Sequence, residues 1–495
     1  MTAPRERFIA ALALVFLCVV GVSEITSSPA IKDASETLRM ALNLERHGVI
    51  SIDEELPYQA SMQREPVPIV TTAAAIYLTD RVRGEAATAQ YFSGERVRCL
   101  KLQNLLWLLM LAVSVFAAVR RFHGSFWLAL LGSGLAVSPF TWYMPAGLKM
   151  YIGMDSLDTD LAGAALLSAA VLLLSVGVAQ RERLTCIAAS VCFGVLALTK
   201  ASIFYVYPVV LLILACYWSV AVLCRASRSA ASSGSAMPRR PTPRAWYAGA
   251  AALAIPFLLV TSPWLLRNYA DTGFFAIAER GGPVLLYRAF LDEVTPEEYL
   301  GAFSAWGNPY GRKLAGKLTG FDAQDLQAGG RLQRLAMQFS GAAQEREVQA
   351  EDSGIPEQTI SWYRQSRAIY NQQLARFTAQ GHRYPSGAAD EATRNDAMRL
   401  IVQRPFKHLL LMVPLIWRGA VLSFPLLLAT LLLAWKQDRT DLLVYALTPL
   451  ALVGFFAAAT HFSERYGYVP APEATVCLMV LSGWAAARWK KARSG

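Results

Sequence analysis

The chain has 495 residues, of which 54% are hydrophobic and only 17% are charged. A soluble protein of this size needs more charge on its surface, so the composition excludes an ordinary soluble globular protein and predicts a polytopic membrane protein. The net charge of +11 would suit nucleic-acid binding, but the basic residues cluster beside apolar segments. We therefore interpret this charge as a signal of membrane topology and expect no nucleic-acid partner.

Ten apolar segments are candidate transmembrane helices, because each crossing of a bilayer needs roughly 20 mostly apolar residues. The first segment follows Arg5 and Arg7 as a signal peptide would, but no convincing small-residue cleavage site follows it, so we interpret it as a retained helix. The ten segments are residues 8–22, 102–119, 126–143, 161–179, 184–198, 203–224, 247–266, 418–435, 442–460 and 469–487.

Basic residues predict the orientation of these segments, because Lys and Arg concentrate in cytoplasmic loops. With every basic cluster in the cytoplasm, ten crossings place both termini there. The chain then divides into an N-terminal membrane module (1–224), a flexible basic linker rich in Arg, Ser, Ala and Pro (225–246) and a C-terminal membrane part (247–495). The clusters are Arg5/Arg7, Arg120/Arg121, Arg181/Arg183, residues 225–244, Lys436/Arg439 and Arg488/Lys490/Lys491.

Two long segments are expected outside the cytoplasm. Residues 23–101 contain the apolar stretch 67–78, which is too short to cross a membrane and predicts an interfacial or re-entrant helix. Residues 268–407 have an ordinary soluble composition, with helical periodicity over 332–348 and 358–377. The expected fold is mainly α: a polytopic membrane helical bundle of about ten transmembrane helices, with extracytoplasmic helical loops and a small extracytoplasmic domain.

Asp33 and Glu36 follow the first span and are candidate catalytic acids. Three residues apart, they share one face of a helix. A carboxylate at the membrane surface can act as a general base and take the proton of an attacking acceptor hydroxyl. The alternative interpretation is a capping box at the start of that helix, and capping and catalysis do not exclude each other.

A second group of acids, Asp155, Asp158 and Asp160, precedes the fourth span. Carboxylates this close to a bilayer are costly to desolvate, so we expect them to face water or a cavity. Asp160 and Asp158 are therefore candidate functional acids. The alternative is a solvated helix N-terminus, where acids favour the positive end of the helix dipole.

Cations on the outer side are candidate phosphate ligands, because a phosphate leaving group needs charge stabilisation. Lys200, Arg267 and Arg465 all lie at outer ends of spans under the expected topology, against the positive-inside pattern. Arg64 of the first outer segment is a fourth candidate. The alternative is that each side chain snorkels to the membrane interface.

Cysteine and histidine provide no sign of a metal site. The seven cysteines fall mostly inside or beside apolar segments, and there is no CxxC motif or Cys/His cluster. We therefore expect neither a zinc site, nor a disulfide framework, nor a bound cofactor.

Segments along most of the chain, taken in order, resemble the GT-C glycosyltransferase superfamily, in the branch that contains protein O-mannosyltransferases and the aminoarabinose transferases of lipid A. Residues 33–48 resemble the first-loop Asp-Glu helix of that family, and 63–78 resemble its Arg-Pro-Pro continuation. Family members usually have adjacent Asp and Glu, whereas here Ala34 follows Asp33 and Glu36 is displaced. The other matching segments are 94–121, 159–167 (TDLAGAALL), 196–208, 263–286 and 464–472 (ERYGYVPAP).

The resemblance implies an inverting transferase whose donor is a sugar linked to a polyprenyl phosphate, acting on the extracytoplasmic face. It implies that Asp33 is the base, that Asp160 or else Asp158 orients acceptor or sugar, and that the candidate cations bind the departing lipid phosphate. It also implies that no catalytic divalent metal is needed. The partners would be the lipid donor, the bilayer and an acceptor that is a lipid, a polysaccharide or a protein.

Two other functions are compatible with the sequence. A transporter or flippase for an anionic polyprenyl-linked lipid would place ionisable residues at mid-span, whereas here they concentrate in outer segments and span ends. A non-catalytic cell-envelope assembly protein would have no need of Asp33 and Asp160. The composition also suggests a bacterial inner membrane, with the active site on the periplasmic side.

Overall fold

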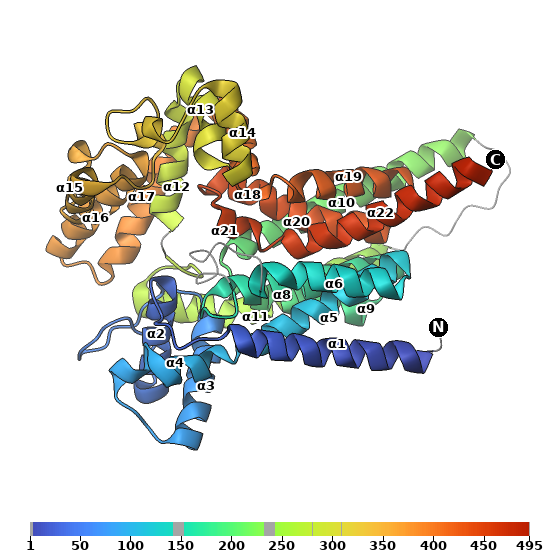
Figure 1. The fold of residues 1–495 in the computed structure, drawn as a ribbon, viewed down its shortest axis with the longest axis horizontal. Coiled ribbons are helices and arrows are strands. Elements are labelled where there is room, and N and C mark those ends of the chain that lie inside the picture. The colour runs from blue at the N-terminus through green and yellow to red at the C-terminus, as the bar shows by residue number, and fades with distance from the viewer. Residues whose placement is uncertain (1–2, 142–152, 232–242, 280, 308, 495) are drawn as a thin grey trace.

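The computed structural model describes residues 3–141, 153–231, 243–279, 281–307 and 309–494, and over these ranges the chain forms helices and turns without a β-strand. A bundle of long helices runs along one axis of the molecule (Figure 1). The bundle helices are α1 (Ala3–Glu24), α5 (Asn104–His123), α6 (Phe126–Thr141), α8 (Thr159–Gln180), α9 (Arg183–Ala197), α10 (Ser202–Ala231), α11 (Pro243–Thr272), α19 (Ser423–Lys436), α20 (Thr440–Ala459) and α22 (Ala471–Ser494).

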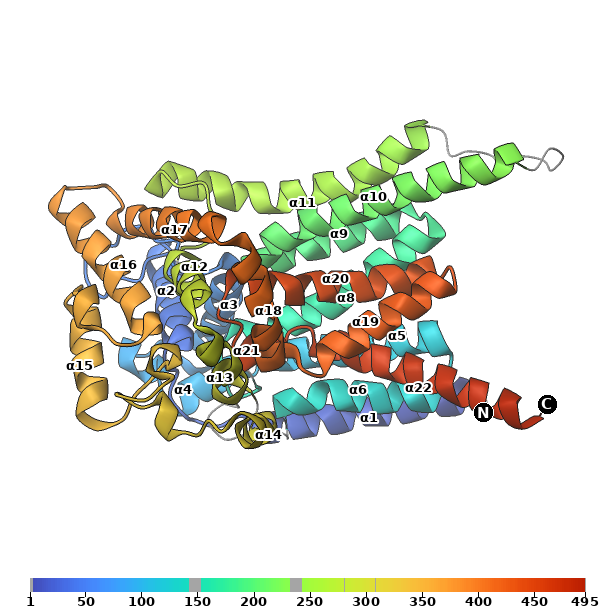
Figure 2. The same ribbon diagram turned by 90° about the horizontal axis from the view of Figure 1, so that it is seen from above.

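Helix α8 forms the centre of the bundle and packs against α5, α9 and α20. Its sequence alternates small residues with leucine and valine, as in TDLAGAALLSAAVLLLS, so neighbouring helices approach closely. Figure 2 shows α8 and α20 in the middle, with α10 and α11 on one side and α1 and α6 on the other. The N-terminal end of this central helix therefore lies deep within the molecule rather than at its edge.

Five helices of the described chain are long and apolar enough to cross a membrane. A sixth span results if α17 and α18, which meet at a bend of 103°, count as one. Other bundle helices, such as α6, α9 and α19, are apolar but shorter, so the ten-crossing topology stays a prediction. The five are Pro4–Glu24, Gly94–His123, Thr159–Gln180, Ala248–Thr272 and Thr440–Ala459.

Two predictions of helix extent were wrong. The expected span 418–435 is interrupted, because α18 ends at Ala420 and α19 begins at Ser423. Pro425 in the first turn of α19 has no N–H to donate and its ring blocks a continuous helix. The periodic segment 332–348 is also not one helix: a 3₁₀ turn is followed by α15 (Gly341–Asp352). Gly341 has φ +58, a conformation that leaves the helical path.

The outer segments lie together beyond one end of the bundle, and the N-terminal end of α1 and the C-terminal end of α22 lie at the other end (Figure 1). The first segment contains α2 (Asp33–His47), α3 (Pro66–Arg83), η1 (Thr88–Tyr91) and α4 (Gly94–Lys101). The second contains α12 (Gly281–Phe290), η2 (Leu291–Glu293), α13 (Pro296–Trp306), α14 (Pro309–Thr319), η3 (Gln324–Leu326), η4 (Gln333–Leu335), α15, η5 (Pro356–Gln358), α16 (Trp362–Ala379), α17 (Pro385–Gln403) and α18 (Pro405–Ala420).

Helices α2 to α4 have an apolar core of their own, which fixes α2 against the end of the bundle. Leu38, Met40 and Leu42 of α2 are buried with Ile69 and Ile76 of α3. Helix α2 ends at Gly48, whose left-handed conformation (φ 69) lets its N–H donate to the carbonyl of Leu44. The predicted helix over 67–78 is α3, which is not among the helices able to span a membrane.

Candidate active site

An ion-pair network forms where α2, α3 and the bundle meet, and it contains every predicted site residue except Arg267. The acids come from α2 and from the start of α8. The cations come from the turn before α3, from the α9–α10 turn and from the short helix α21 (Glu464–Gly467). The network residues are Asp33, Glu36, Arg64, Asp158, Asp160, Lys200 and Arg465.

Asp160 anchors two of the cations. Lys200 Nζ lies 2.5 Å from its Oδ1, and Arg465 Nε donates to its Oδ2. The Asp160 side chain is fully buried. One turn further along α8, Gly163 leaves room for the lysine stem, since a Cβ there would lie 3.2 Å from Lys200 Cγ. Both oxygens of the Asp160 carboxylate are therefore paired with cations.

Arg465 connects the buried and the exposed parts of the network. Its Nη1 lies 3.0 Å from Asp33 Oδ2, and its Nη2 lies 3.4 Å from Asp158 Oδ1. Burial by itself lowers the pKa of Arg465, but the charges of Asp160, Asp158 and Asp33 more than offset this and raise the pKa well above its ordinary value. The guanidinium therefore remains cationic at any physiological pH.

The position of Arg465 depends on a close backbone contact. Helix α21 packs against α18, and a side chain at Gly467 would collide with the carbonyl of Gly419. Only glycine at this position allows the turn to approach α18 so closely. The short α21 turn thus presents Arg465 toward α8 and α2.

Arg64 forms the outer edge of the network. It pairs with Asp33, and its Nε donates to Glu36 Oε2 at 2.8 Å. Next to it, the Glu65 carboxylate accepts from the backbone N–H of Ala201 at 3.2 Å, which ties the start of α3 to the turn that carries Lys200. Burial lowers the pKa of Arg64, but the charges of Asp33 and Glu36 outweigh it and raise that pKa.

The carboxylates of the network differ sharply in exposure. The side chain of Asp33 is 36% exposed and that of Glu36 is 26% exposed, against 3% for Asp158 and 0% for Asp160. Asp33 is therefore accessible from outside the network, whereas Asp160 is screened by its partners.

The geometry contradicts the alternative interpretations of these residues. Helix α2 has Lys32 at its cap position without a side-chain cap hydrogen bond, so the predicted capping box is absent there. Asp158 and Asp160 are buried rather than solvated at the start of α8. Lys200 is 10% exposed and paired, so it does not snorkel to an interface.

Arg267 lies outside the network. Its Nη1 donates to the carbonyl of Ser61 at 2.9 Å, and its Nε pairs with Asp271 at 2.9 Å. Its guanidinium also stacks over the Trp264 ring. These contacts fix the loop that leads to Arg64, and direct binding of phosphate by Arg267 stays a prediction.

Sequence reasoning missed Lys101, a buried cation near the site. Its Nζ lies 2.8 Å from Asp155 Oδ1 and donates to the carbonyls of Thr26 and Ser28. The hydrogen bonds of Lys101, Thr26 and Ser28 lower the pKa of Asp155 against the opposing effect of its burial. A lysine directly before an apolar span on the outer side was the available signal, because it breaks the positive-inside pattern.

No protein-family model and no curated protein matches this chain. Within the described ranges, no group of three or more His, Cys, Asp or Glu side chains is arranged to hold a metal ion. What the residues define is an exposed carboxylate supported by arginines, at one end of a bundle whose apolar helices suit a membrane.

Proposed function

We propose that this protein is an integral-membrane inverting glycosyltransferase that moves a sugar from a polyprenyl-phosphate donor to an acceptor hydroxyl. The observation that carries the proposal is the partly exposed Asp33 carboxylate, which pairs with both Arg64 and Arg465. Such a site combines a base for the acceptor with fixed cations for a phosphate leaving group.

The reaction requires one proton transfer and one displacement. Asp33 accepts the proton of the acceptor hydroxyl while that oxygen attacks the anomeric carbon from the side opposite the phosphate. The bond between the anomeric carbon and the phosphate oxygen breaks, and the electron pair leaves with the lipid phosphate. Arg64 and Arg465 stabilise the negative charge on that phosphate.

The ion pairs of the resting site fit this sequence of events. When a lipid phosphate binds the two arginines, it competes with Asp33 for their N–H donors. The carboxylate is then less neutralised and becomes a better base. Asp160, which is buried and holds Lys200 and Arg465, acts as a positioning residue rather than as a contact to the substrate.

We also propose that the chain crosses a bacterial inner membrane ten times, with both termini in the cytoplasm. The site would then face the periplasm, where a lipid-linked donor is presented within the bilayer. The placement of α2–α4 and α12–α17 at one end of the bundle supports a common face for the two outer segments (Figure 1).

Transfer can be tested with the purified full-length chain in lipid nanodiscs, a radiolabelled polyprenyl-phosphate hexose and a mixture of cell-envelope acceptors. We expect Asp33→Asn to reduce transfer about 10²-fold or more. The exposed Asp396→Asn substitution on α17 is the matched control. Unchanged transfer by a folded Asp33→Asn variant would contradict the role of Asp33 as base.

Lipid transport is the second candidate, because one acid lies inside the bundle. Glu473 of α22 is fully buried, and its Oε1 accepts from Ser168 of α8 at 2.5 Å. Buried carboxyls within spans often belong to ion or substrate pathways. Movement of a fluorescent polyprenyl phosphate across the bilayer without sugar transfer would favour this function.

A further inference from the structure

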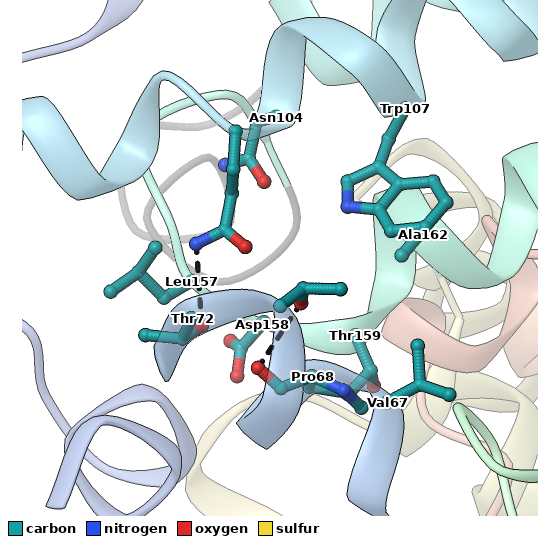
Figure 3. A pocket seen from close by; sticks show the side chains of 11 residues that line it. Val67, Pro68, Thr72, Asn104, Trp107, Leu157, Asp158, Thr159 and Ala162 are labelled. Atoms are coloured by element: carbon teal, nitrogen blue, oxygen red, sulfur yellow. Dashed lines mark hydrogen bonds between the residues drawn. The ribbon is translucent and has the colours of Figure 1, made fainter. Parts of the chain in front are cut away.

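A small recess lies beside the ion-pair network, between the N-terminal turns of α3, α5 and α8. It encloses about 280 Å³ including its open mouth, and its interior admits little more than a water-sized group. Figure 3 shows the Asp158 side chain among Thr72, Pro68 and Thr159, with Trp107 and Ala162 on the α5 and α8 side.

Asp158 lines this recess and has an oxygen without a hydrogen-bond partner. Its side chain is 97% buried, since only 3% of it is exposed, and its Oδ2 has no hydrogen-bond partner. Its Oδ1 has one ion-pair contact, to Arg465 Nη2 at 3.4 Å. A buried carboxylate oxygen without a hydrogen-bond donor destabilises the folded state, and native proteins provide a hydrogen-bond partner for nearly all such atoms.

The other lining groups do not supply the missing donor. Gln103 Nε2 already donates to Thr72 Oγ1 at 3.3 Å and to the carbonyl of Leu100 at 3.1 Å. Thr71 Oγ1 donates to the carbonyl of Pro68. No lysine or arginine lines the recess, and Asp158 is its only ionisable lining residue. The recess therefore repels an anion and favours a group that brings its own N–H or O–H.

The position of Asp158 links the recess to the reacting groups. One guanidinium, that of Arg465, contacts Asp33 through Nη1 and Asp158 through Nη2. Asp33 and the recess residue Asp158 are therefore neighbours across a single guanidinium group. The recess is too small for a sugar ring but accepts one substituent of a ring.

We propose that this recess binds a non-reacting hydroxyl or ammonium group of the sugar carried by the donor, with Asp158 Oδ2 as the acceptor of its hydrogen bond. The inference rests on the proposed function and adds a residue that determines which sugar is held. Phosphate recognition by Arg64 and Arg465 and sugar recognition by Asp158 are then carried out by neighbouring residues of the same network.

Binding of three lipids to the full-length chain in nanodiscs tests this inference. The probes are a polyprenyl phosphate without sugar and the same lipid carrying a hexose or an aminopentose. The variants are Asp158→Asn, which removes the charge of the acceptor, and Ala162→Leu, which fills the recess but retains the acid. Asp396→Asn is again the matched control.

We expect both recess variants to weaken binding of the sugar-bearing lipids about tenfold, with less than about a twofold change for the sugar-free lipid. A larger loss for the aminopentose than for the hexose with Asp158→Asn identifies an ammonium group. Equal weakening of all lipids would overturn the inference, because Asp158 would then act only through Arg465. Unchanged binding of all lipids by both variants would overturn it as well. If no lipid binds to the wild type, the proposed function itself fails, and the sugar assignment fails with it.

Discussion

Asp33 and Arg465 lie 432 positions apart in the sequence and pair at 3.0 Å in the structure. This contact joins the first outer helix to the turn before the last helix of the bundle. Because the same guanidinium also holds Asp160, the exposed carboxylate is connected to the centre of the bundle.

Replacement by lysine should lower sugar transfer more at Arg465 than at Arg267. A lysine has one ammonium and cannot contact Asp33, Asp158 and Asp160 together, so we expect Arg465→Lys to lower transfer about 10²-fold. Arg267→Lys should lower transfer less than tenfold, because Arg267 lies outside the network. Equal losses measured under identical donor concentrations would contradict this division.

Removal of the Asp160 charge should destabilise the protein. Asp160→Asn leaves Lys200 and Arg465 without their buried partner, and breaking a buried ion pair costs about 3–5 kcal/mol. Thermal unfolding in detergent micelles should show a clear decrease in melting temperature. The conservative Asp33→Asn substitution, at a site 36% exposed, should change the melting temperature less. The reverse order would contradict the anchoring role of Asp160.

Asp158 should make stability depend on pH near neutrality. Burial raises the pKa of Asp158 to about 7, against the opposing charge of Arg465 and with a further increase from Asp160. The folded state therefore binds a proton that the unfolded state releases between about pH 4 and pH 7, so stability falls as pH rises through this range. Asp158→Asn should remove this dependence, so its free energy of unfolding relative to wild type should be higher at pH 8 than at pH 5 by about 1 kcal/mol or more. Identical pH profiles of unfolding for wild type and variant would contradict the shift.

The Lys101–Asp155 pair should make stability depend on pH in the acidic range instead. The pKa of Asp155 is lowered in the folded state, so its contribution to stability is present above the unfolded pKa of about 4 and is lost as pH falls through the folded pKa. Asp155→Asn should therefore be less stable than wild type at pH 7, and the difference should shrink below about pH 4. Unfolding curves at pH 7 and pH 3 measure this directly, and a constant difference would contradict it.

The proposed topology can be tested by labelling single cysteines in a cysteine-free background with a membrane-impermeant maleimide. Ser353→Cys, exposed after α15, should react in intact spheroplasts. Lys490→Cys, exposed near the end of α22, should react only after permeabilisation. Labelling of both positions from the same side would contradict the assignment of the two ends of the bundle to opposite faces.

Much of the fold follows from local sequence. Runs of apolar residues determine where the bundle helices lie, and the short apolar run 67–78 became a helix that is not able to span a membrane. The errors arose where local backbone chemistry outweighed apolar composition, at Pro425 inside the expected span 418–435 and at Gly341 inside a periodic segment. The number of crossings depends on how the bilayer surrounds the helices as well as on the sequence, and it stays a prediction.

The sequence by itself determined which residues could carry charge at the outer ends of the helices, because Asp33, Asp160, Lys200 and Arg465 each interrupt or border apolar segments. Only the tertiary structure decided which of them are paired, which are buried and which remain exposed. Burial and ion pairing depend on distances between segments hundreds of residues apart, and these distances are set by the packing of α2, α8 and α21 against one another. The same packing left Asp158 with an unpartnered oxygen beside a recess, a feature that no local pattern predicts.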